Sequence, residues 1–209
     1  MRMGVYYEMM FNADVFEESF SHGKGMISAT EDNLDDFSTE KYKKGFYRHI
    51  LKDGVEIKEW PSVKFFYDSE KGDVEADYLR NTVNWLVVHK RVQKAFEKEN
   101  ISGLQYLPVK VIDVVTKEEN RDYVAVNILN VIEAYDMIKS EYEYKEKYNI
   151  YSFLPHTTYL DLKVVKKYDI FRATKFRPSI YVSQKIKDLI DENQWTGFDF
   201  IRQKTNQLD

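Results

Sequence analysis

Two stretches of the chain follow one pattern without a gap. Residues 86–107 read LVVHKRVQKAFEKENISGLQYL, and residues 180–201 read IYVSQKIKDLIDENQWTGFDFI. Gly103 in the first stretch corresponds to Gly197 in the second, an offset of 94 residues. A pattern that recurs along a chain predicts that one local structure occurs twice. We therefore expect these two stretches to organise the fold.

Each stretch predicts a strand, a helix and a second strand. The apolar run that contains Val88 or Val182 is typical of a buried strand, and the apolar residues that follow it recur at helical spacing. Apolar and polar residues then alternate at 104–107 and 198–201, which indicates a strand with one buried face.

The residues at the ends of each predicted helix also correspond. Ser183 is a favourable first residue, because its hydroxyl can accept a hydrogen bond from a free backbone amide, whereas His89 is less favourable. Gly103 and Gly197 come just after the helices, where a turn with positive φ favours a residue without a Cβ. We interpret both glycines as turn residues rather than parts of a ligand loop.

The rest of the chain predicts mainly strands. Short apolar or alternating runs lie at 63–67, 104–115, 123–131, 141–146, 150–154, 159–165 and 170–173. With two helices against many strands, we expect an α+β fold, in which both helices cover one face of a mixed, mostly antiparallel sheet. The chain of 209 residues is long enough for a substantial core, and we expect a single domain over 1–209.

Composition places the chain among globular proteins. Hydrophobic residues make up 43% and charged residues 32%, which is too apolar for a disordered chain. The net charge of −4 argues against a nucleic-acid partner, which favours a basic surface. The chain has no cysteine, no apolar stretch long enough to span a membrane and no signal-peptide core at its start. We expect a cytoplasmic protein that binds neither membranes nor nucleic acids.

No pattern of catalytic or metal-binding residues stands out. The histidines His22, His49, His89 and His156 are far apart, and none forms a zinc-type pair on one helix face. Adjacent carboxylates point in different directions on a regular element, so they do not form a catalytic dyad. The sequence predicts no catalytic residue, no metal and no cofactor.

The order of motifs between residues 77 and 203 resembles a known family. The motifs are Asp77-Tyr78-Leu79, Gly103-Leu104-Gln105-Tyr106, Asn127 and Asp136 after Tyr123, Ile170-Phe171-Arg172, and Thr196-Gly197-Phe198-Asp199-Phe200. Together they resemble immunity protein family eleven of bacterial polymorphic toxin systems, or the related family forty-three. His89 stands where the family pattern has a serine. Residues 77–203 are then the family-like core, and residues 1–76 a variable N-terminal arm.

The resemblance implies a non-enzymatic immunity protein, an antitoxin that binds and neutralises a cognate bacterial toxin. Two other hypotheses stay open: a small hydrolase or nucleotide-processing enzyme, and a regulatory protein-interaction module. The family-like positions are expected to build the fold rather than to contact the toxin; they are Gly103, Gly197, Ser183, Val88, Val182, Phe171, Asn127 and Asp136.

Toxin-binding residues are therefore expected outside the shared motifs. The acidic residues Asp32, Asp35 and Asp36 lie in a polar segment and suit a basic partner. Tyr142 and Tyr144 alternate with acidic residues, so their rings lie on one face of a strand. That face either packs on the core or forms an aromatic ridge for a partner.

Overall fold

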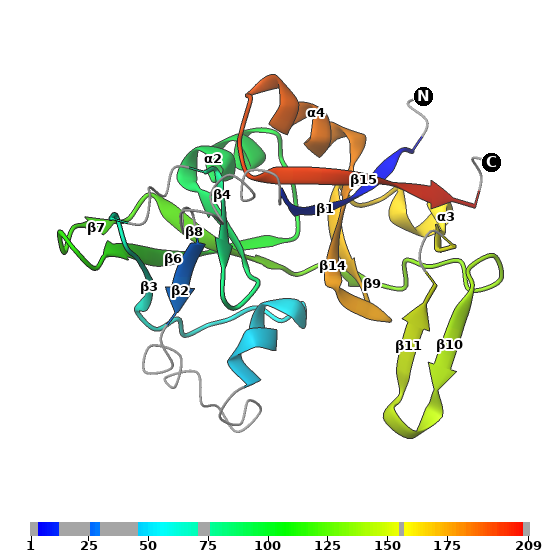
Figure 1. The fold of residues 1–209 in the computed structure, drawn as a ribbon. Coiled ribbons are helices and arrows are strands. Elements are labelled where there is room, and N and C mark those ends of the chain that lie inside the picture. Colours follow the sequence, from blue (N-terminus) through cyan, green and yellow to red (C-terminus); the bar gives the residue numbers. More distant parts are fainter. Residues whose placement is uncertain (1–3, 13–25, 30–45, 71–75, 155–156, 207–209) are drawn as a thin grey trace. The chain divides into compact units, whose positions relative to one another are not determined.

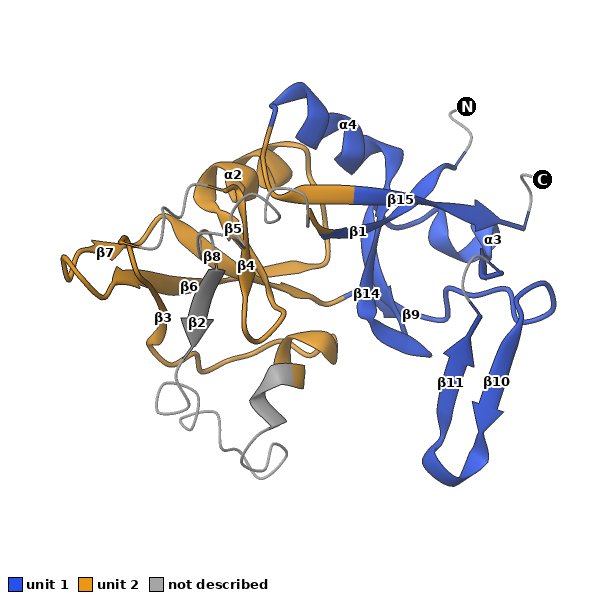
Figure 2. Ribbon diagram, viewed as in Figure 1, with its two compact units in different colours: residues 1–10, 130–194, 200–209 blue, residues 11–129, 195–199 orange. Residues whose placement is uncertain are grey.

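The computed structural model describes residues 4–12, 26–29, 46–70, 76–154 and 157–206. The chain divides into two compact units, shown in Figures 1 and 2. Unit 1 comprises Met1–Met10, Asn130–Gln194 and Phe200–Asp209, and unit 2 comprises Phe11–Leu129 and Trp195–Asp199. Each unit therefore combines segments that are far apart in the sequence.

The fold is mostly β, with 44% strand, 18% helix and two curled sheets. The expected α+β class, with two repeat-related helices as a main layer, is therefore wrong. In the part of the chain that the structure describes, the two longest α-helices, at 90–98 and 184–192, have only nine residues each. Helical spacing thus extends over about two and a half turns in each stretch, whereas strand patterns cover most of the remaining sequence.

Unit 2 is built on one curled sheet. Its elements are β2 (Met26–Ala29), η3 (Phe46–Lys52), β3 (Val63–Tyr67), β4 (Tyr78–Asn81), β5 (Leu86–His89), α2 (Lys90–Lys98), β6 (Leu104–Asp113), β7 (Glu119–Asn120) and β8 (Tyr123–Ile128). The strand order is β3-β2-β4-β5-β8-β6-β7. A parallel pairing of β3 with β6 joins the two sides of this sheet. Phe65 and Trp85 pack edge to face in its core.

Strand β8 lies between β5 and β6 and pairs antiparallel with both. All six of its side chains are buried, which explains why residues 123–128 read as a nearly continuous apolar run. Asn127 is the polar exception. Its side-chain amide donates hydrogen bonds to the Val55 carbonyl at 2.8 Å and to Gln105 Oε1 at 3.0 Å. This family-motif residue therefore fastens a connecting segment to the sheet.

Pro108 lies where β6 changes its partner. Leu104 to Pro108 pair with β8, and Val109 to Asp113 pair with β3. A proline cannot donate to a ladder, so a change of partner is a tolerant position for it. Its carbonyl accepts a hydrogen bond from Trp60 Nε1 at 2.8 Å. The sequence suggested an edge or a bulge here; Pro108 pairs with Val124 of β8, and the ladder with β3 begins at the next residue, Val109.

Unit 1 contains a second curled sheet and a separate hairpin. Its elements are β1 (Tyr6–Phe11), β9 (Val131–Ile132), β10 (Tyr142–Lys145), η4 (Glu146–Tyr148), β11 (Ile150–Phe153), β12 (Tyr159–Leu160), α3 (Leu162–Val165), β13 (Ile170–Ala173), β14 (Phe176–Ser183), α4 (Gln184–Glu192) and β15 (Phe198–Thr205). The strand order is β12-β15-β1-β14-β13-β9. An isolated bridge from Tyr135 to Leu160 connects the chain after β9 with β12. Phe171 is fully buried in the core of this unit.

The region 159–165 differs from its expected strand. Only Tyr159–Leu160 is extended, and a short helix follows at Leu162–Val165. The carboxylate of Asp161 accepts a hydrogen bond from the Lys163 amide at 2.9 Å and so caps this helix. The apolar residues in this region therefore belong to two elements with different periods.

The two longer helices begin differently from the expectation. His89 Nδ1 accepts a hydrogen bond from the Arg91 amide at 3.1 Å, so histidine caps α2. Ser183 makes no such bond to α4, because its hydroxyl donates to Asp169 Oδ1 at 2.7 Å. The predicted order of capping strength is therefore reversed by the neighbouring carboxylate, which competes for the serine.

Both helices end in the same way. The residue after each C-cap, Asn100 or Gln194, has a left-handed backbone with φ of 56° or 54°. Gly103 and Gly197 follow with φ of 77° and 87°, at the turns that lead into β6 and β15. At these positions a side chain would be strained, so glycine is favoured by the backbone itself.

Corresponding backbone hydrogen bonds hold the N-cap residues of α2 and α4. In unit 2, the His89 amide donates to the Asp77 carbonyl at 2.8 Å, and in unit 1 the Ser183 amide donates to the Asp169 carbonyl at the same distance. Strand β8 lies between β5 and β6, and β1 occupies the corresponding place between β14 and β15. The first strand of the chain thus completes the sheet of the later unit.

Candidate functional site

The hairpin formed by β10 and β11 is a separate two-stranded sheet in unit 1 and extends away from the larger sheet of that unit (Figure 1). Its register pairs Tyr142 with Phe153 and Tyr144 with Tyr151. Large apolar or aromatic side chains are exposed along it: Tyr142, Tyr144, Tyr148, Ile150 and Leu154. Such a concentration of exposed apolar groups makes the hairpin a candidate interaction surface.

The aromatic rings form a continuous row on one face of the hairpin. Centroids lie 4.7 Å apart for Tyr144 and Tyr151, and 5.8 Å apart for Tyr142 and Phe153. Phe153 also lies 4.4 Å from Tyr135, which connects the row to the core of unit 1. Tyr144 Oη donates to Asn149 Oδ1 at 3.0 Å near the hairpin turn. These contacts hold the rings in place before any partner binds.

A groove of about 740 Å³ runs beside this hairpin within unit 1. Residues 150–154 of the hairpin line one part of it, and residues 201–204 of β15 line another. Phe176 and Ile201 add two further exposed apolar side chains to its lining. The groove therefore continues the apolar surface of the hairpin.

The interior of the groove carries hydroxyl groups. Tyr135 and Tyr181 share a hydrogen bond of 2.7 Å between their hydroxyl oxygens. Burial raises the pKa of Tyr181 to about 12, and burial with the neighbouring Tyr181 raises the pKa of Tyr135 well above its ordinary value. Both phenols are therefore neutral at physiological pH. The Ser179 hydroxyl donates to the carboxylate of Glu8.

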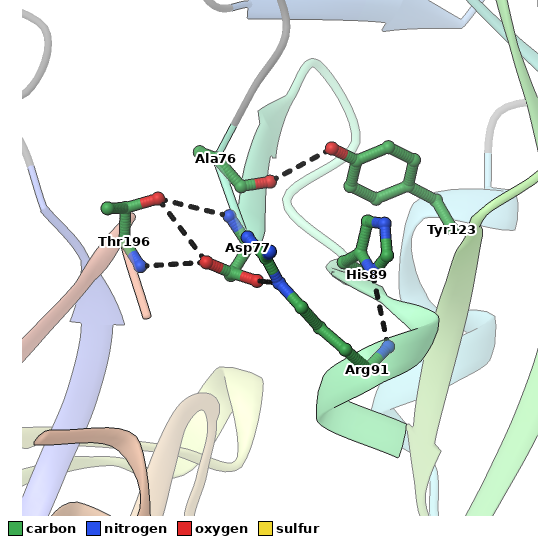
Figure 3. Close-up of polar contacts among 6 residues, drawn as sticks. All are labelled: Ala76, Asp77, His89, Arg91, Tyr123 and Thr196. Atoms are coloured by element: carbon green, nitrogen blue, oxygen red, sulfur yellow. Dashed lines mark hydrogen bonds and ion pairs between the residues drawn. The ribbon is translucent and has the colours of Figure 1, made fainter. Parts of the chain in front are cut away.

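A polar cluster in unit 2 surrounds Asp77 (Figure 3). One oxygen of the buried carboxylate accepts a bond from Arg91 Nε, and the other accepts one from the Thr196 amide at 3.0 Å. The Asp77 amide in turn donates to Thr196 Oγ1 at 3.3 Å. One carboxylate oxygen thus holds Thr196 next to the start of β4, and the other holds Arg91 of α2, which indicates a structural role rather than acid/base catalysis.

His89 lies at the same place but is already used as a cap. Burial, together with the nearby Arg91 charge, lowers the pKa of this imidazole below its ordinary value. Its Nδ1 accepts the Arg91 amide, and its ring packs edge to face on Tyr123 at 5.2 Å. Among the residues that the structure describes, no group of three or more His, Asp or Glu side chains is placed to hold a metal ion.

We expect Asp77→Ala to lower the free energy of unfolding by about 2 kcal/mol, because it leaves the Thr196 amide without its buried acceptor. Urea denaturation of the variant measures this loss. Glu119→Ala is the matched control, since Glu119 forms only exposed ion pairs with Arg121 and Lys110. Equal stability of the two variants would contradict a structural role for Asp77.

The sequence model of the immunity protein family Imm11 matches residues 7–205. The chain belongs to the Imm11 immunity protein family. The resemblance inferred from the motifs is thereby confirmed. No curated protein matches the chain.

The Imm11 match extends further than the motifs suggested. The likeness was expected over residues 77–203, but the match also includes most of residues 1–76. Strands β1, β2 and β3 lie in that N-terminal region and pair with strands of the core. This part of the Imm11 chain therefore contributes to both sheets.

Of the predicted toxin-binding residues of this Imm11 protein, two lie in the described part of the structure and three lie outside it. Tyr142 and Tyr144 lie on β10 and are 39% and 44% exposed. Asp32, Asp35 and Asp36 lie outside the described residues, in the connection between β2 and β3.

The sequence reasoning missed several residues of the site. Tyr148, Ile150 and Leu154 continue the exposed surface, and their apolar spacing within 142–154 was the available signal. Phe176 and Ile201 gave no local signal, because they join the groove only through the pairing of distant strands.

In the described part of the chain, no helix combines the length and the apolar character needed to cross a membrane.

Proposed function

We propose that this Imm11 protein binds a cognate bacterial toxin and neutralises it without catalysing a reaction, using the β10–β11 hairpin as its main contact surface. The observation that carries the proposal is the row of exposed aromatic rings on this hairpin. Membership of the Imm11 family supports an immunity role for the chain.

Physical chemistry supports a protein partner at this surface. Tyrosine contributes a large contact area at a low cost in side-chain entropy, and its hydroxyl tolerates water in the free protein. Exposed tyrosines surrounded by charged residues resemble the centre and rim of many protein interfaces. On the hairpin, Glu143 and Lys145 alternate with the two tyrosines along β10 and supply charges on the other face of the strand.

The mechanism we propose is occlusion. A hairpin that extends from its own unit can enter a cleft of the toxin or cover its entrance, which blocks the substrate or a required motion. Because the rings already contact one another and Tyr135, binding would order few additional side chains. We place this encounter in the cytoplasm of the producing cell, the compartment that the sequence favours.

Co-expression tests the proposed function. The chain is produced together with each toxin encoded beside its gene, and growth and complex formation are measured. We expect one toxin to be neutralised and to co-purify with the chain, while an unrelated toxin stays active. Absence of rescue and of any complex across all neighbouring toxins would contradict the proposal.

A further inference from the structure

The outer edge of β11 has backbone groups that are open to a partner. The Leu154 amide donates to the Glu141 carbonyl at 3.1 Å, which fixes alternate residues of β11 as bonded to β10. Tyr151 and Phe153 lie between those bonded positions, so their N–H and C=O groups point away from β10. Within the described chain, β11 has no strand on this second side. An extended segment can therefore add to the hairpin there.

The groove lies along this part of the hairpin. Its lining includes all residues from Ile150 to Leu154, together with residues 201–204 of β15. An extended segment rises about 3.3 Å per residue, so four residues span roughly 13 Å along β11. The volume of about 740 Å³ and the exposed side chains of Phe176 and Ile201 provide room and apolar contacts for alternate side chains of such a segment.

Charge in the groove selects the chemistry of the segment. Lys145, Arg202 and Lys204 line it, whereas Glu8 is the single carboxylate among the described residues of its lining. Glu8 already accepts a hydrogen bond from Ser179, and the buried phenols of Tyr135 and Tyr181 are neutral. A segment that carries acidic residues would therefore be attracted, even though the whole chain has a net charge of −4.

We propose that the groove binds an extended acidic segment of the toxin, which adds as a strand to the outer edge of β11. This inference rests on the proposed function and specifies the part of the toxin that the hairpin recognises. Main-chain hydrogen bonds to Tyr151 and Phe153 would supply affinity. The cations of the groove would fix the register of the added strand and select a segment with negative charge.

Charge reversal tests the electrostatic part. The double variant Arg202→Glu, Lys204→Glu is compared with Lys166→Glu, Lys167→Glu, which makes the same change in charge on exposed residues of unit 1 outside the groove. Surface plasmon resonance with the purified toxin measures association at low and high salt. We expect the groove variant to associate about 10-fold more slowly at low salt, and the control to match the original chain. Equal association rates for both variants would overturn the acidic-segment proposal.

A proline comparison tests strand addition. Tyr151→Pro removes the outward N–H, and Tyr151→Ala removes the same ring but keeps that N–H. We expect the proline variant to bind the toxin about 10-fold more weakly than the alanine variant, with unchanged thermal melting of the chain. If Tyr151→Pro lowers the melting temperature, the pair Phe153→Pro and Phe153→Ala replaces it. Equal affinities within a folded pair would refute strand addition, whereas failure of the original chain to bind any neighbouring toxin would instead refute the proposed function.

Discussion

Replacing Tyr142 and Tyr144 together with alanine is expected to weaken the toxin complex about 1,000-fold, because central aromatic residues each contribute about 2 kcal/mol to such interfaces. Both rings are exposed in the free protein, and each contacts the neighbouring ring of β11. Isothermal titration calorimetry with the purified toxin measures the change in Kd, and growth in the co-expression assay should fail in parallel.

Two controls separate recognition from folding in that experiment. The double variant Tyr142→Phe, Tyr144→Phe keeps both rings and should retain most of the affinity. The double variant Val114→Ala, Val115→Ala truncates two exposed apolar side chains of unit 2 and should bind as the original chain does. Unchanged affinity after loss of both tyrosine rings would contradict the placement of the interface on this hairpin.

Gly197→Ala is expected to cost roughly 3 kcal/mol of folding free energy. The φ of Gly197 is +87°, and a Cβ built at this position would lie 2.4 Å from the backbone carbonyl oxygen of Tyr78. Neither the turn nor β4 can relax easily, because the Tyr78 amide also donates to the Thr196 carbonyl at 3.1 Å. Gly197→Val should be worse still, since a β-branched residue tolerates positive φ badly.

Chemical denaturation of purified variants measures this cost. Gly103→Ala is the matched control, because Gly103 has a φ of +77° at the corresponding turn. This variant measures the cost of placing a side chain at a positive φ. We expect Gly197→Ala to be the more destabilised variant by virtue of the close approach to Tyr78. Equal denaturation midpoints for Gly197→Ala and the original chain would contradict this account of the turn.

Local signals predicted many elements of this fold. The apolar runs at 63–67 and 170–173 coincide with β3 and β13, and the helical spacing places α2 and α4 at positions 94 residues apart. These features depend on the spacing of apolar residues and on turn residues, both of which are local properties of the sequence. The alternation that includes Tyr142 and Tyr144 likewise predicted a strand at the position of β10.

The remaining features depend on distant residues. Asp77 and Thr196 meet across 119 positions, and β1 enters the sheet between β14 and β15 from the opposite end of the chain. The fold class was predicted wrongly because the two helices were expected to form a layer on one sheet, whereas each covers only part of a curled sheet. The sequence did not predict the groove, because β11 and β15 line it from distant parts of the chain.

Hydrogen–deuterium exchange of the chain, alone and in its toxin complex, tests the hairpin interface most directly. Peptides that cover residues 141–154 are predicted to exchange more slowly in the complex, and those that cover β3 and α2 are predicted to keep their rates. An intact complex in which residues 141–154 exchange as fast as in the free chain would contradict the account.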